Sequence, residues 1–129
     1  MIVAVDFDGV LCEDEFPAIG REVPQMVAAV RRVRGAGHEL VLWTSRTGER
    51  LQEALEWCRR RGVEFDAVND QAPSNAAQYG ALYPQGTRKV YADVYVDDHS
   101  LEWVAQQSRY GRGGAMALAL ARIEEVFHE

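Results

Sequence analysis

The chain has few cysteines, a deficit of basic residues and no long apolar run. Its two cysteines, Cys12 and Cys58, lack a metal-ligand spacing such as C-x-x-C, so we expect both to be reduced packing residues. No stretch approaches the roughly 18 apolar residues of a membrane span, and the five apolar residues at the start are too few for a signal-peptide core. We therefore expect a cytoplasmic protein with no membrane partner.

The charge balance also narrows the classes of partner. The sequence has 14 Lys and Arg against 20 Asp and Glu, for a net charge of −6, which disfavours a surface that coats nucleic acid. Apolar residues make up 47% of the 129 positions, enough to form one hydrophobic core. With no repeat, linker or low-complexity tract in view, we expect a single domain over residues 1–129.

Strand-like and helix-like patterns alternate along the chain. Short apolar runs predict strands at residues 2–5, 40–43, within 62–69 and at 94–96. Apolar stripes at helical spacing, with glycines at their ends, predict helices at residues 23–35, 48–61, 101–107 and 113–129. Residues 12–21 and 69–88 are rich in turn formers and are predicted loops, the second with room for one helical turn. This alternation predicts an α/β fold with a central parallel sheet.

The last predicted helix carries an apolar stripe of Met116, Leu120, Ile123 and Phe127. We expect this stripe to cover one face of the sheet. Homodimerisation through the same stripe is the alternative.

Three of the predicted strands end in polar side chains. They are followed by Asp6 and Asp8, by Thr44, Ser45 and Arg46, and by Asp97 and Asp98. The carboxyl ends of parallel strands share one edge of a sheet, where ligands bind. Four carboxylates gathered there would repel one another, so protons or a divalent cation must neutralise them. Oxygen ligands without nearby Cys or His favour Mg²⁺.

Together these motifs resemble the haloacid dehalogenase (HAD) superfamily of phosphohydrolases. The resemblance rests on "DFDGVL" at 6–11, "VLWTSR" at 41–46, Lys89 and "VYVDD" at 94–98, and it covers residues 1 to about 100. It implies a three-layer Rossmann-like (HAD-like) fold. The 38 residues that separate Asp6 from Thr44 hold one loop, one helix and one strand, so the chain is most similar to small members without a cap domain.

The resemblance also implies catalytic roles. Asp6 is expected to be the nucleophile that forms an aspartyl-phosphate, and Asp8 the general acid and base. Thr44 is expected to donate a hydrogen bond to the transferring phosphoryl group. Lys89 is expected to neutralise its charge, with Arg88 as the alternative cation.

Metal and substrate contacts follow from the same resemblance. Asp6, the backbone carbonyl of Asp8, Asp97 and Asp98 are the expected Mg²⁺ ligands, the last directly or through a water. The expected substrate-binding residues are Gly9, Ser45, Arg46 and Asn69. Gly9 also permits a tight turn directly after the strand.

The sequence thus predicts a Mg²⁺-dependent phosphatase that hydrolyses a phosphomonoester, with a small metabolite as substrate in preference to nucleic acid. The loop at 69–88 or a second subunit would then form a lid over the open site. One alternative is a polynucleotide-end phosphatase, which the Thr-Ser-Arg turn also resembles. A second alternative is a catalytically inactive phosphate- or Mg²⁺-binding module.

Overall fold

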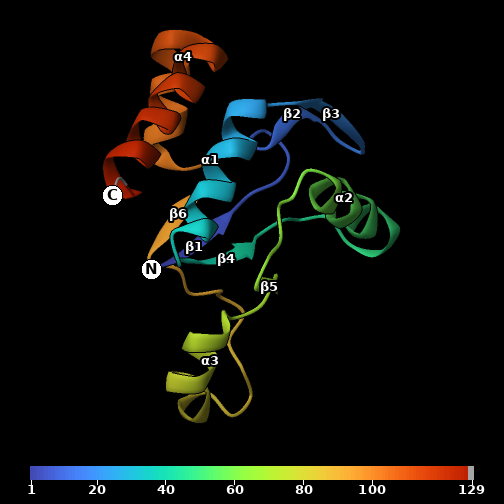
Figure 1. The fold of residues 1–129 in the computed structure, drawn as a ribbon, viewed down its shortest axis with the longest axis vertical. Helices are drawn as coiled ribbons and strands as arrows, with labels where there is room; N and C mark the ends of the chain where they lie inside the picture. Colours follow the sequence, from blue (N-terminus) through green and yellow to red (C-terminus); the bar gives the residue numbers. More distant parts are fainter. Residues whose placement is uncertain (128–129) are drawn as a thin grey trace.

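The predicted parallel sheet is confirmed in a computed structural model, which describes residues 1–127 (Figure 1). Four strands lie in the order β5-β4-β1-β6 and all pair in parallel. Their bounds are β1 Ile2–Val5, β4 Glu39–Leu42, β5 Ala67–Val68 and β6 Val94–Val96. The fold is therefore α/β, as the alternating pattern predicted.

Strand β1 lies inside the sheet and is buried on both faces. Its side chains alternate between two cores: Val3 and Val5 belong to one, Ile2 and Ala4 to the other. A strand covered on both faces reads as an unbroken apolar run, which is the pattern of the first residues of the sequence.

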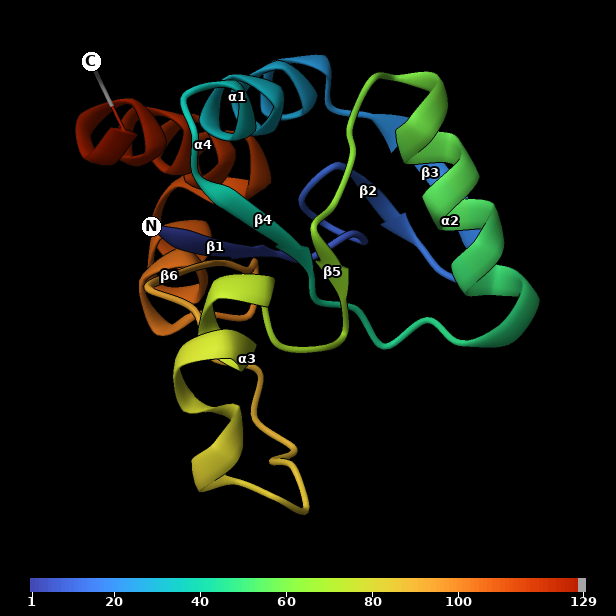
Figure 2. The ribbon, with the colours of Figure 1, turned by 60° about the horizontal axis from the view of Figure 1, so that its bottom comes forward.

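Three helices build the larger core on one face of the sheet (Figure 2). They are α1 Pro24–Gly35, α2 Gly48–Arg60 and α4 Leu101–Phe127. Pro24 occupies the first turn of α1, where its missing N–H costs nothing. Gly37 follows α1 with φ of 99°, a conformation that glycine adopts without strain. The helices predicted at 23–35 and 48–61 are confirmed to within a residue at each end.

Helix α4 joins the two helices predicted near the C-terminus. Gly111, with φ of 76°, is non-helical and marks the break between them. Ile123 is buried, and the other residues of the stripe pack against the same core, so the stripe covers the sheet as expected. The predicted helix extends to Glu129, but its last two positions lie outside the described residues.

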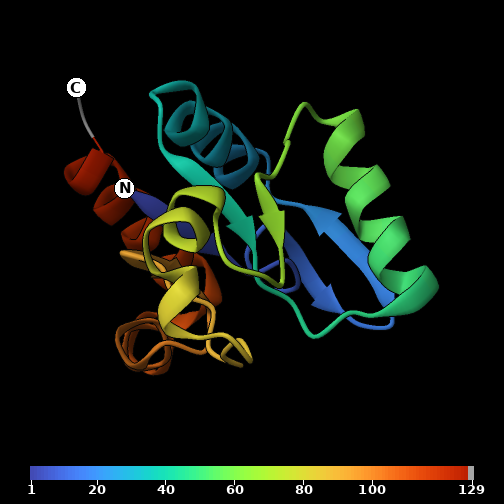
Figure 3. The same ribbon diagram turned by 90° about the horizontal axis from the view of Figure 1, so that it is seen from below.

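The opposite face of the sheet has a thinner cover (Figure 3). Ala72, Val90 and Ala92 pack there against the strands, next to α3 Pro73–Tyr79 and the 3₁₀ helix η1 Gly80–Leu82. The sequence predicted a loop with at most one helical turn at 69–88. This prediction is wrong, because residues 73–82 form α3 and η1. Because α3 buries none of its residues, it leaves no apolar stripe in the sequence. The molecule therefore has three layers.

Residues 12–21 contain a second correction. They are not a loop but form most of an antiparallel hairpin of β2 Cys12–Glu15 and β3 Ala18–Glu22. The run "CEDE" is acidic and mostly exposed, without the alternation or β-branched residues that predict a strand. Between β1 and β4 the described chain forms only this hairpin and α1, which leaves no cap domain at that place.

Among residues 1–127, no helix combines the length and the apolar character needed to cross a membrane.

Candidate functional site

The strand ends meet at one edge of the sheet, with Asp6 at the centre. β1 lies between β4 and β6, and the backbone ladder continues past it: the Asp6 N–H donates to Val96 O at 3.0 Å. Asp97 follows β6 on one side, while Thr44 follows β4 on the other. The predicted convergence of polar strand ends is confirmed.

Asp6, Asp97 and Asp98 form a cluster of carboxylates, which we call the acidic cluster. Each offers an oxygen atom, and these atoms lie within 4.8 Å of one another. Burial, a hydrogen bond shared with the Asp98 carboxyl group and the charge of Asp97 raise the pKa of Asp6 to about 8. The pKa of Asp98 is also raised, chiefly by burial. The acidic cluster therefore holds a proton at neutral pH unless a cation replaces it.

Asp98 has an oxygen that lacks a partner. Its Oδ1 is buried and accepts no hydrogen bond from any residue in 1–127. A ring nitrogen, Nε2 of the exposed His99, lies 4.0 Å away, beyond hydrogen-bond distance. A buried oxygen without a donor is costly for the protein and suits a hard cation as its partner.

The turn after β1 presses against this carboxylate. Gly9 has φ of +85°, and a Cβ on Gly9 would overlap Oδ2 of Asp98. Glycine is thus required here both for the backbone conformation and for space. Gly9 was predicted from the sequence to contact substrate. In the structure it lies against the Asp98 carboxylate.

Asp97 starts the last helix as well as contributing to the acidic cluster. Its Oδ1 accepts a hydrogen bond from His99 N at 2.8 Å, and its carbonyl accepts one from Ser100 N at 3.0 Å. Helix α4 begins at Leu101, directly after Ser100, so this turn fixes the Asp97 carboxylate relative to the sheet.

Asp8 is held apart from the acidic cluster by Arg46. The guanidinium donates from Nε to Oδ2 and from Nη2 to Oδ1, each at 2.8 Å, in a two-pronged pair. Only 1% of Arg46 is exposed. Both oxygens of Asp8 are therefore occupied by a buried cation of the protein.

The same guanidinium reaches the β2–β3 hairpin. Nη1 donates to Pro17 O at 3.2 Å and Nη2 to Ala18 O at 3.0 Å. The rings of Phe7 and Phe16 each lie 5.1 Å from its central carbon. The sequence predicted that Arg46 contacts substrate, whereas the structure shows it engaged with Asp8 and the hairpin. Its partners in the hairpin are backbone carbonyls, and a side-chain motif in the sequence cannot predict such contacts.

Thr44 and Asn69 are tied together across β4 and β5. Asn69 Oδ1 accepts from Thr44 N at 2.8 Å, and Asn69 Nδ2 donates to Thr44 O at 2.9 Å. Thr44 Oγ1 accepts from Arg46 N at 3.1 Å, while Ser45 is exposed. Asn69, with φ of 50°, thus positions the predicted phosphoryl-binding loop through its backbone.

Lys89 and its neighbour Arg88 are exposed. Neither forms an ion pair with a carboxylate of residues 1–127. Gln71 Nε2 donates to the backbone carbonyl of Lys89 at 2.7 Å, which holds this segment near the end of β5. The structure thus does not join Lys89 to the acidic cluster, and the choice between Lys89 and Arg88 stays a prediction.

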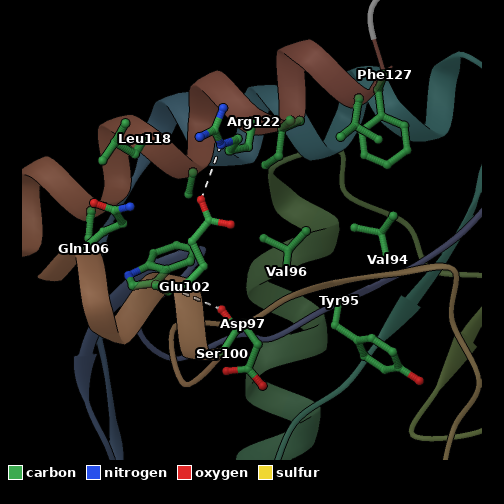
Figure 4. A pocket seen from close by; sticks show the side chains of 15 residues that line it. Val94, Tyr95, Val96, Asp97, Ser100, Glu102, Gln106, Leu118, Arg122 and Phe127 are labelled. Carbon is green, nitrogen blue, oxygen red and sulfur yellow. Dashed lines mark hydrogen bonds and ion pairs between the residues drawn. The ribbon is translucent and has the colours of Figure 1, made fainter.

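A small apolar cavity adjoins the acidic cluster on the helical side (Figure 4). It has a volume of about 200 Å³ and lies between β6 and α4, with Val94 and Val96 on the strand side. Arg122 Nε lies 3.3 Å from Glu102 Oε1 beside it. Its mainly apolar lining suits packing better than it suits a phosphate group.

No family model matches the chain, and no curated protein sequence matches it. A solved structure does: a conserved protein from Bacteroides thetaiotaomicron superposes with a TM-score of 0.66. It shares 36% sequence identity, over 84% of this chain and 89% of that one. At this identity and coverage, the chain belongs to the same family as that conserved Bacteroides protein.

Proposed function

We propose that this protein is a Mg²⁺-dependent phosphatase that hydrolyses a phosphomonoester through an aspartyl-phosphate on Asp6. The observation that carries the proposal is the acidic cluster at the end of the central strand, in which Asp98 Oδ1 has no partner among residues 1–127. The motif resemblance to HAD phosphohydrolases agrees with this arrangement. The hydroxyl-bearing loop at Thr44 follows the adjacent strand.

The residues present fit a magnesium ion. Asp6, Asp97 and Asp98 offer oxygen ligands at short mutual distances, and a fourth comes from the Asp8 carbonyl if the resemblance holds. When bound, Mg²⁺ would offset the negative charge of the carboxylates and of the phosphate group.

Asp6 is arranged as a nucleophile. Its Oδ1 accepts a hydrogen bond from Phe7 N at 2.8 Å, which orients the carboxylate at the strand end. In the first step an Asp6 oxygen bonds to phosphorus while the ester P–O bond breaks, and the alcohol leaves with a proton. In the second step water attacks the phosphorus and gives a proton to Asp8, the bond between the Asp6 oxygen and phosphorus breaks, and inorganic phosphate leaves.

Asp8 is the proposed source of the proton for the alcohol. A carboxylate held at both oxygens by Arg46 cannot carry that proton in the same geometry. Proton transfer therefore requires the pair to loosen, and because Arg46 also bonds Pro17 and Ala18, the hairpin would move with it. This restraint on Asp8 also favours the second candidate, a binding module that takes up Mg²⁺ and phosphate without turnover.

Replacing the nucleophile tests the proposal. With Mg²⁺ and a generic phosphomonoester, Asp6→Asn should lower kcat/KM by about 10⁴-fold or more, as loss of a covalent nucleophile does in other enzymes. Asp14→Asn makes the same chemical change at an exposed hairpin position and should retain the activity. Circular dichroism would verify that both variants fold.

Undiminished turnover by Asp6→Asn would refute the proposed nucleophile. If the wild-type protein binds Mg²⁺ in calorimetry but releases no phosphate from any ester, the binding-module candidate is the correct one. For the proton-transfer step, Asp8→Asn should slow hydrolysis of esters with poor leaving groups more than that of activated esters.

A further inference from the structure

A second cavity lies between α3–η1 and the segment at 86–91. Its volume is about 560 Å³, within the range of small-molecule sites. Three tyrosines, an amide and two charged side chains contribute to its wall: Tyr79, Tyr83, Tyr91, Gln71, Lys89 and Asp70. None of them belongs to the acidic cluster.

The three tyrosines are exposed. Tyr79 is 42% exposed, Tyr83 54% and Tyr91 46%. All three line the same cavity, so each contributes part of its surface to one wall. Grouped aromatic surface binds planar rings by stacking.

The cavity wall is fixed by hydrogen bonds. Gln71 donates to Lys89 O at 2.7 Å and accepts from Tyr91 N at 3.0 Å, which ties the segment at 86–91 to the start of α3. Asn75 Nδ2 also donates to Gln71, at 3.0 Å. The Tyr91 hydroxyl donates to Asp93 Oδ1 at 2.7 Å. The site is therefore preformed and needs little ordering when a ligand binds.

In the sequence, the first residues of the cavity wall follow the proposed phosphoryl-binding loop's partner, Asn69. Asp70 and Gln71, which line the cavity, follow directly after Asn69, whose side chain is bonded to the Thr44 backbone. Lys89 adds a cation that forms no ion pair with residues 1–127. An anionic ester that carries a ring matches this combination of charge and aromatic surface.

We propose that this cavity binds a planar aromatic ring in the alcohol part of the substrate, such as a nucleobase or an aryl group. The inference rests on the proposed function and narrows its substrate class to small ring-bearing phosphomonoesters. Tyr83, the most exposed of the three tyrosines, is the side chain whose removal reports most directly on ring binding.

Calorimetry on the full-length Asp6→Asn variant tests the inference without turnover. The probes are adenosine 5′-monophosphate, which carries a nucleobase, O-phosphotyrosine, which carries an aryl ring, and ribose 5-phosphate, which carries no aromatic ring. At least one ring-bearing ester should bind about tenfold more tightly than ribose 5-phosphate, and the tighter of the two identifies the kind of ring. Adding Tyr83→Ala should reduce that preference to about twofold or less.

Tyr110 provides a matched control. It is also 54% exposed but lies on α4, outside the cavity, so adding Tyr110→Ala should leave the ring preference unchanged. Equal binding of all three esters, or a preference that survives Tyr83→Ala, would overturn the inference. Wild-type hydrolysis of ribose 5-phosphate would still support the phosphatase in that case. Conversely, a ring preference in a protein that hydrolyses no ester would leave the cavity assignment intact and refute the phosphatase.

Discussion

Two carboxylates at the end of β1, only two residues apart, have opposite electrostatic surroundings. Asp8 is paired through both oxygens with a buried guanidinium of the same chain. Asp6 faces two further carboxylates, and its pKa is raised to about 8 by burial and by these neighbours. Within residues 1–127, the fold supplies a cationic partner for Asp8 but forms no ion pair with Asp6.

The difference indicates what each carboxylate is for. The Arg46–Asp8 pair neutralises Asp8 within the chain and also attaches the β2–β3 hairpin to the loop after β4, so Asp8 can serve as the proposed acid only when this pair loosens. A carboxylate cluster with an unsatisfied oxygen is costly to the folded protein and is kept where a ligand completes it. We interpret the acidic cluster as the part of the site that an external cation completes.

The largest effect should follow from breaking the internal pair. Arg46→Ala leaves the Asp8 charge and two hairpin carbonyls without partners, so the free energy of unfolding should fall by about 3–5 kcal/mol. Denaturant unfolding measures this loss. If Arg46→Ala does not fold, Arg46→Lys keeps the charge without the two-pronged geometry and should show a smaller loss.

An exposed pair provides the control for that experiment. Arg59 donates to Glu56 through Nε at 2.8 Å and Nη2 at 2.6 Å, nearly the geometry of the buried pair. Its side chain is 68% exposed, so Arg59→Ala should leave the unfolding midpoint within experimental error. Equal losses in Arg46→Ala and Arg59→Ala would contradict the assigned role of burial.

A smaller effect should follow from crowding the acidic cluster. In Gly9→Ala the new methyl group overlaps Asp98, and the backbone must keep φ of +85°. We expect a loss of about 1–3 kcal/mol in stability, together with weakened Mg²⁺ affinity, because Asp98 must move. Gly86→Ala is the matched control, since Gly86 also has a positive φ but no atom lies near its Cβ position. Mg²⁺ affinity should decline in Gly9→Ala alone.

The last effect concerns pH. Because the pKa of Asp6 is raised from the usual 3.8 of an aspartate to about 8 in the folded protein, the folded state binds the proton more tightly than the unfolded chain does. Protonation of Asp6 therefore contributes fully to stability below pH 4, and in the absence of divalent cations this contribution is lost as pH rises to about 8. Asp6→Asn should flatten this decline and make the metal-free protein at pH 8 more stable than the wild type. Thermal unfolding in EDTA across this pH range is the measurement, and a steeper decline in Asp6→Asn would contradict the assignment.

Much of the fold and the acidic cluster could be predicted from the sequence because both leave local signals. Buried parallel strands produce apolar runs, and the carboxyl ends of such strands share an edge, so Asp6, Asp97 and Asp98 could be grouped in advance. Helix α3 left no signal, since it buries no residue, and the hairpin is built from acidic residues that rarely form strands.

The environment of each side chain could not be predicted in the same way. Arg46 is paired with a residue 38 positions away, and its other partners are carbonyls of an unpredicted hairpin. The grouping of three tyrosines likewise depends on how α3 and the segment at 86–91 fold back on each other. These contacts are long-range, and no periodicity encodes them.

The central claim is that the acidic cluster holds a cation beside a phosphoryl group on Asp6. A crystal structure of the protein with Mg²⁺ and beryllofluoride tests it most directly. We predict a metal ion ligated by Asp6 and by at least one of Asp97 and Asp98, with beryllofluoride bonded to an Asp6 oxygen. An acidic cluster that binds neither group under these conditions would contradict the account.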